Sequence, residues 1–114
     1  MMEHEMGLQE VHYNNMLKGI KVYEGRINDE KRQKINIGDI IKILKDPLRE
    51  ESFYVKIKNK YLFKSFNEMS EKLDIYKLGF VKETKEEVVN VYHEFYNQDK
   101  EDKYGVVVFE IELI

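Results

Sequence analysis

The chain has 114 residues, with 19 Lys and Arg against 22 Asp and Glu, so its formal net charge is −3. It contains no cysteine, which excludes disulfides, zinc–thiolate sites, iron–sulfur clusters and cysteine nucleophiles. No apolar run approaches the ~18 residues of a membrane helix, and the first residues lack the basic-then-apolar order of a leader peptide. We therefore expect a soluble, cytoplasmic protein with one domain over residues 1–114, and the mildly acidic total argues against a general polyanion binder.

The first third of the chain predicts two strands around a short helix. Residues 4–9 suit a strand, and residues 11–18 suit a helix that ends at Gly19, the usual residue for a left-handed helix terminus. Residues 20–27 are rich in β-formers and predict a second strand. The polar, charged residues 28–36 predict a loop.

The middle of the chain predicts two more strands and a helix. A Gly-Asp turn signal precedes a strand over residues 40–44, and alternating apolar residues predict a strand over residues 52–63. Ser65 and Glu68 have the spacing of a capping box, so a helix should begin there. Residues 75–80 predict one or two further helical turns.

The last third predicts a helix followed by a long strand. Thr84 and Glu87 form a second capping box. The helix it opens has apolar residues at amphipathic spacing: Val88, Val91, Tyr92 and Phe95. Residues 106–114 predict the final strand. Because most strands are not spaced for parallel strand–helix–strand units, we expect an α+β fold: a small curved mixed sheet or partial β-barrel flanked by short helices.

The strand over residues 20–27 holds the most informative side chains. Glu24 and Arg26 share a face because side chains alternate along a strand. They form either a solvent-exposed pair or, if that face points inward, the lining of a cleft that a polar ligand enters. Lys21 has the opposite parity and joins them only if it precedes the regular pleating. The three histidines, His4, His12 and His93, are scattered, and we expect a surface or packing role for each.

Charge is unevenly distributed along the chain. Residues 18–34 carry six cations and three anions, a net +3, which leaves −6 for the rest of the chain. The segment with Lys31 and Arg32 is either a solvated loop or a phosphate-contact patch beside a base-sized cleft, with Tyr23 nearby. Local recognition of one or a few nucleotides is compatible with this distribution.

Several blocks of the chain, taken in order, resemble the ASCH (activating-signal-cointegrator homology) domain family. They comprise His4 to Leu8, Lys21-x-x-Glu24-x-Arg26, Asn28 to Arg32, Ile37 to Ile41, Tyr61 to Phe66, Tyr92-x-x-Phe95-Tyr96 and Lys103 to Val107. The resemblance implies a PUA-like fold and an RNA-related role. It implies ligand binding by Lys21, Tyr23, Glu24, Arg26, Lys31 and Arg32, with RNA or a nucleoside or nucleotide as partner and neither a metal nor another cofactor.

One bacterial branch of the family implies a second hypothesis, a metal-independent amidohydrolase acting on N4-acylated cytidine. Its working groups here would be Lys21, Glu24 and Glu87, although the branch has a Thr nucleophile where this chain has Glu24. Glu87 is explained equally well by the capping box with Thr84. A weak ribonuclease activity and a role in protein interactions complete the hypotheses.

Overall fold

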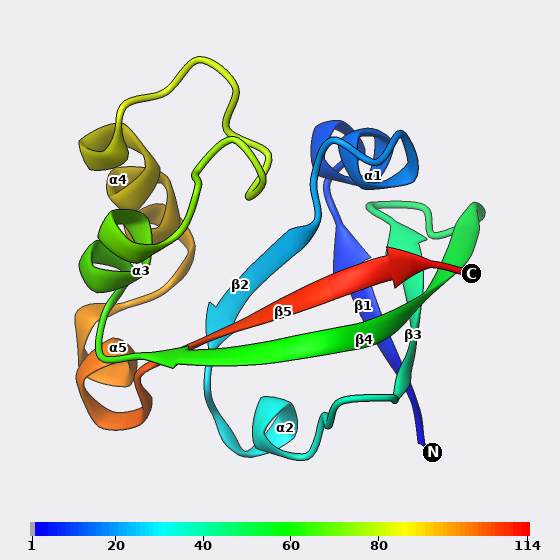
Figure 1. Ribbon diagram of the computed structural model, residues 1–114, viewed down its shortest axis with the longest axis horizontal. Coiled ribbons are helices and arrows are strands. Elements are labelled where there is room, and N and C mark those ends of the chain that lie inside the picture. The colour runs from blue at the N-terminus through cyan, green and yellow to red at the C-terminus, as the bar shows by residue number, and fades with distance from the viewer. Residues whose placement is uncertain (1) are drawn as a thin grey trace.

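The computed structural model describes residues 2–114 and contains a five-stranded mixed sheet with helices around it (Figure 1). Met1 lies outside the described residues. It is the first residue of the stretch in which the sequence predicts no leader peptide. The strands, in order of pairing, are β1 (Glu3–Leu8), β3 (Ile40–Lys45), β4 (Ser52–Phe63), β5 (Val106–Leu113) and β2 (Tyr23–Ile27).

The sheet curls into a half-barrel, which confirms the predicted α+β fold class. β1 pairs with β3 in parallel, and the other three pairings are antiparallel. The register of the long β4 strand against β5 shifts between Ile57 and Asn59, and such irregularities bend a strand. The edge strands β1 and β2 lie on either side of an open seam, which the Arg26 side chain spans by donating a hydrogen bond to the carbonyl oxygen of Gly7.

Strand β5 separates two hydrophobic cores and is buried on both faces. Val107 and Phe109 point into the half-barrel and belong to the first core, which we call the inner core. Val106 and Val108 point outward to the helices and belong to the second, the outer core. This two-sided burial explains why residues 106–109 are a continuous apolar run rather than an alternating one.

Helix α1 (Glu10–Leu17) contributes Tyr13 and Met16 to the inner core and ends just before Gly19, which has a φ of 82°. The other helices are α2 (Glu30–Gln33), α3 (Phe66–Lys72), α4 (Lys85–Phe95) and α5 (Gln98–Tyr104). Figure 1 shows α3, α4 and α5 grouped at one end of the sheet, where β2, β4 and β5 converge. Phe66 and Val88 of this group bury themselves in the outer core.

A buried carboxylate joins these three helices. Glu101 of α5 is only 2% exposed, and its side chain accepts a hydrogen bond of 2.7 Å from the backbone N–H of Phe66 at the start of α3. Its second oxygen lies 2.7 Å from Nε2 of His93 on α4. Because buried polar groups need partners, this arrangement fixes α3, α4 and α5 relative to one another.

The structure corrects the expected element boundaries at four places. The strand predicted over residues 20–27 begins only at Tyr23, because the N–H groups of Ile20 and Lys21 both bond to the carbonyl of Asn15. The predicted loop 28–36 contains α2, residues 75–80 form turns rather than a helix, and α5 was not expected. In both unexpected helices a side chain, Asp29 or Asn97, accepts a hydrogen bond from the backbone N–H three residues later. This cap stabilises the start of a charged segment that has no apolar stripe.

The two predicted helix starts differ in detail. Thr84 and Glu87 form the full reciprocal capping box at α4. At α3 the Ser65 side chain accepts from the N–H of Glu68, but the Glu68 carboxylate accepts from the N–H of Lys64, so only half of the predicted box is present. No helix within residues 2–114 is long and apolar enough to cross a membrane.

Candidate functional site

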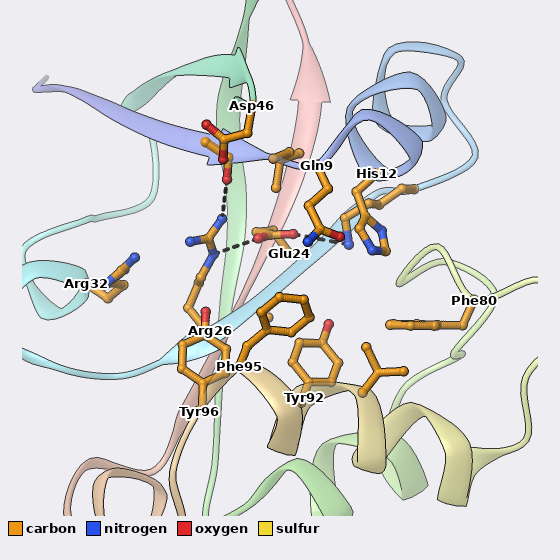
Figure 2. A pocket seen from close by; sticks show the side chains of 15 residues that line it. Gln9, His12, Glu24, Arg26, Arg32, Asp46, Phe80, Tyr92, Phe95 and Tyr96 are labelled. Carbon is orange, nitrogen blue, oxygen red and sulfur yellow. Dashed lines mark hydrogen bonds and ion pairs between the residues drawn. The ribbon is translucent and has the colours of Figure 1, made fainter. Parts of the chain in front are cut away.

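A pocket of about 380 Å³ lies at the open seam of the half-barrel (Figure 2). Its walls come from the end of β1, from α1, from β2 and from α4, so the segments that form it are distant in sequence. Ligand sites are typically clefts of this size that combine apolar walls with a few polar groups. The pocket is therefore the candidate functional site of the described residues.

Strand pairing directs Glu24 and Arg26 toward the inside of the half-barrel. In the antiparallel register, Glu24 lies opposite Phe109 and Arg26 lies opposite Val107, and both partners belong to the inner core. Directly opposed residues of an antiparallel pair project from the same face of the sheet. Of the two sequence interpretations, the inward-facing pair is the one the structure contains.

Glu24 is the centre of a buried three-charge cluster. Its Oε1 lies 3.1 Å from Nζ of Lys21, and its Oε2 lies 2.7 Å from Nε of Arg26. Lys21 is 2% exposed and also donates to the carbonyl oxygens of Tyr23 and Leu78, at 2.8 and 2.6 Å. The three N–H donors of the ammonium group are thus all occupied.

Lys21 reaches Glu24 because it precedes the regular strand. Its backbone N–H bonds to the carbonyl of Asn15, and β2 begins two residues later. The side chain therefore escapes the alternation that would send it to the opposite face. The turn after α1 is the reason these two residues meet.

The cations keep Glu24 ionised. Burial alone would raise the pKa of this carboxyl, but Lys21 and Arg26 outweigh burial and lower the pKa to about 2. Burial lowers the pKa of Lys21 and Glu24 opposes that change, while Glu24 raises the pKa of Arg26 despite its burial. A carboxylate with so low a pKa is a weak general base at neutral pH, because efficient bases have a pKa near the working pH.

The cationic end of the pocket has donors left over. Arg26 uses Nε for Glu24 and Nη2 for the carbonyl of Gly7 at 3.0 Å, and its Nη1 takes part in neither contact. Arg32 also lines the pocket, with Nη1 3.0 Å from Oδ2 of Asp29. The residues lining the pocket include three cations, Lys21, Arg26 and Arg32, and two carboxylates, Glu24 and Asp46, which leaves one positive charge uncompensated. The count is the same when the ion-pair partners outside the lining, Asp29 of Arg32 and Arg49 of Asp46, are added.

The opposite wall of the pocket is aromatic. Four rings contribute to it: Phe80, Tyr92, Phe95 and Tyr96. The Tyr92 hydroxyl points toward Glu24 in Figure 2, and burial raises the pKa of Tyr92 well above its ordinary value, so the phenol stays neutral. Gly25 permits this approach, because a Cβ at that position would lie only 3.1 Å from the Tyr92 hydroxyl oxygen.

Four of the seven residues predicted for the site, Lys21, Glu24, Arg26 and Arg32, come together in the pocket. Tyr23, Lys31 and Glu87 do not line it. The Tyr23 ring faces the outer core beside Tyr61, at 6.3 Å between centroids, while Lys31 is exposed on α2.

Sequence reasoning missed two residues that line the pocket, His12 on α1 and Gln9 just before this helix. The residues next to His12 and Gln9 in the sequence form no recognisable motif. In contrast, the Tyr92-x-x-Phe95-Tyr96 block is one of the blocks that carry the family resemblance.

Glu87 is exposed at the start of α4, where it accepts from the Thr84 N–H at 3.0 Å while its own N–H donates to the Thr84 hydroxyl. These hydrogen bonds lower the pKa of Glu87. We expect Glu87→Gln to leave the affinity for any ligand of the pocket unchanged and to lower the melting temperature slightly, because glutamine keeps the capping bond but loses its charge. Titration calorimetry and thermal unfolding measure both. A large loss of affinity in Glu87→Gln would contradict this placement.

A mixed half-barrel with a pocket at its seam and helices grouped at one end defines an α+β protein of the PUA-like class. The sequence model of the ASCH domain matches residues 6–114, and the chain belongs to the ASCH domain family. This confirms the resemblance found in the sequence. No curated protein matches the chain.

Solved structures agree with this assignment. The crystal structure of the hypothetical protein PH0355 is 42% identical, with a TM-score of 0.87 over 99% of this chain and 100% of that one. The solution NMR structure of protein PF0455 from Pyrococcus furiosus is 39% identical, with a TM-score of 0.78 over 99% and 98%. The crystal structure of ASCH from Zymomonas mobilis is 11% identical, with a TM-score of 0.66 over 95% and 65%, and supports the fold alone.

Proposed function

We propose that this protein binds RNA or a nucleotide in the seam pocket and acts as a single domain over residues 1–114. The observation that carries the proposal is the inward-facing Glu24–Arg26 pair, which lies within a pocket that has one uncompensated positive charge. Membership of the ASCH family supports an RNA-binding type of domain. An anionic ligand with a polar, planar base matches these features.

The chemistry of the two ends of the pocket suggests how such a ligand lies. A phosphate binds at the cationic end, where Arg26 and Arg32 have donors available. The base stacks on the aromatic wall of Phe95 and Tyr96, because stacking on aromatic side chains is common in single-strand recognition. The ionised Glu24 carboxylate accepts a hydrogen bond from a base N–H group.

The other predicted contacts have smaller parts in this proposal. Lys21 has no spare N–H donor, so it orients Glu24 and contributes its charge rather than a direct bond. Lys31 lies outside the pocket and is available only to a longer strand that continues over α2. Tyr23 faces the outer core and supports β2 by packing.

The direct test is a thermal-shift and calorimetric panel with the four nucleoside 5′-monophosphates and a single-stranded hexaribonucleotide. A ligand present at 100 times its dissociation constant should stabilise the folded state by about 2.7 kcal/mol. Binding of any member with a stoichiometry near one supports the proposal. The absence of stabilisation by all five ligands at millimolar concentration overturns it.

The amidohydrolase, ribonuclease and protein-interaction hypotheses, and the cytoplasmic location, stay predictions. Glu24 is paired on both oxygens and Glu87 lies on the surface, so the three groups named for hydrolysis do not converge in the described structure. Release of acetate from N4-acetylcytidine is the assay for the first hypothesis, and RNA cleavage without metal is the assay for the second.

A further inference from the structure

His12 occupies the end of the pocket opposite the arginines. It extends from α1, and its ring packs edge-to-face on Phe80, at 5.8 Å between centroids. Phe80 in turn packs edge-to-face on Tyr92, also at 5.8 Å. Figure 2 shows these side chains along the same side of the pocket. The His12–Phe80 and Phe80–Tyr92 contacts together hold the imidazole ring in its orientation.

One nitrogen of this ring is sealed away from the pocket. His12 Nδ1 is buried and has no hydrogen-bond partner among the described residues. The segment around Gly79 covers it: a Cβ at Gly79 would lie 3.5 Å from Nδ1 and 3.3 Å from Cδ of Lys21. Since Nδ1 is enclosed, Nε2 is the ring nitrogen available to face the pocket.

The surroundings of Nδ1 select the tautomer. A neutral imidazole carries one N–H and one lone pair, and a buried N–H without an acceptor costs about 1–3 kcal/mol. An unpaired lone pair at Nδ1 is also costly, but the positive charge of the neighbouring Lys21 favours a lone pair over an N–H at that nitrogen, so the proton belongs on Nε2. Burial and then Lys21 lower the pKa of His12, with Arg26 adding to this and Glu24 and Glu83 opposing it, so the ring is neutral at pH 7.

We propose that His12 is a specificity-determining contact of the pocket, whose Nε2–H donates a hydrogen bond to a ring nitrogen or carbonyl oxygen of the bound base. This proposal rests on the proposed function of the pocket. His12 offers a donor and Glu24 offers an acceptor, and both line the same cavity. Together they match the edge of a nucleobase, which presents acceptor and donor groups side by side, and they reject an apolar ring of the same size.

Two measurements test the proposal, and the first needs no ligand. Long-range ¹H–¹⁵N NMR of the wild-type protein at pH 7 should show a neutral His12 with the proton on Nε2, and the Nε2 resonance should shift when a nucleoside monophosphate is added. A proton on Nδ1 or a charged ring in the free protein overturns the proposal.

The second measurement compares His12→Asn with His12→Gln by calorimetry against the four nucleoside 5′-monophosphates. A glutamine amide reaches about as far as Nε2, whereas an asparagine amide reaches only about as far as Nδ1. His12→Asn should weaken binding by about 3- to 10-fold, and His12→Gln should stay within about 2-fold of wild type. Unchanged binding by His12→Asn, or equal losses in both variants, overturns the role of His12 alone. If wild type binds none of the four, the proposed function fails and this proposal fails with it.

Discussion

Replacing Glu24 with glutamine is expected to lower the free energy of unfolding at pH 7 by about 3–5 kcal/mol. The wild-type carboxylate compensates two cations, Lys21 and Arg26, which are 2% and 14% exposed at their side chains. The amide keeps the shape of the side chain but leaves both charges buried without a counter-ion, and its NH₂ group faces another donor. Urea unfolding of both proteins gives the difference in free energy.

The pH dependence of this difference provides an internal control. The folded-state pKa of Glu24 is about 2, below the ordinary value of 4.5, so its stabilisation is fully present above pH 4.5. It is lost as the pH falls through 2, where the wild-type carboxyl also becomes neutral. The gap between wild type and Glu24→Gln should therefore narrow below pH 4.5. Glu112→Gln, at the exposed end of β5, is the matched control and should change stability little at any pH. A loss below 1 kcal/mol at pH 7 would contradict the buried cluster.

Replacing Arg26 with lysine is expected to weaken nucleotide binding by about 10- to 100-fold, which corresponds to one charge-assisted hydrogen bond of about 1.5–3 kcal/mol. Lysine keeps the positive charge but lacks the planar fork that contacts Glu24 and the Gly7 carbonyl and that, in the proposed binding mode, also reaches the ligand. Calorimetric titration with the tightest-binding nucleotide measures the change, and circular dichroism checks that the variant is folded.

Lys31→Ala is the matched control for this experiment. Lys31 belongs to the same basic segment as Arg32 but is exposed outside the pocket, so its removal should change mononucleotide affinity by less than about 2-fold. Two results would contradict the proposed binding mode. The first is wild-type affinity in Arg26→Lys, and the second is an equal loss in Lys31→Ala, which would move the binding site to the surface of α2.

The elements that sequence reasoning predicted well are those whose signal is local. The strands over β1, β3, β4 and β5 follow from apolar runs and alternation, and the capping box at Thr84 follows from two residues three apart. The short helices α2 and α5 have no apolar stripe. Their stability comes from a capping side chain and, for α5, from the buried Glu101, and neither has a clear periodic signature.

The residues of the candidate site also differ in how far sequence reasoning could find them. Lys21, Glu24 and Arg26 lie within six residues, so their spacing alone drew attention to them. The rest of the pocket is tertiary: Gly7 and His12 approach from the start of the chain, and Phe80 and Tyr92 from much later segments. Nothing near His12 in sequence indicates that Phe80 will orient its ring or that Gly79 will cover its Nδ1.

The seam also bears on how the protein avoids unwanted association. A half-barrel leaves two strand edges whose unpaired backbone groups could accept a strand from another chain. Here the facing edges of β1 and β2 are bridged by a charged side chain, since Arg26 is held by Glu24 and donates to Gly7 on the opposite edge. Inward-pointing charge of this kind is a known protection against edge-to-edge pairing. The same guanidinium that we assign to ligand binding would thus also keep the free protein from polymerising through its open side.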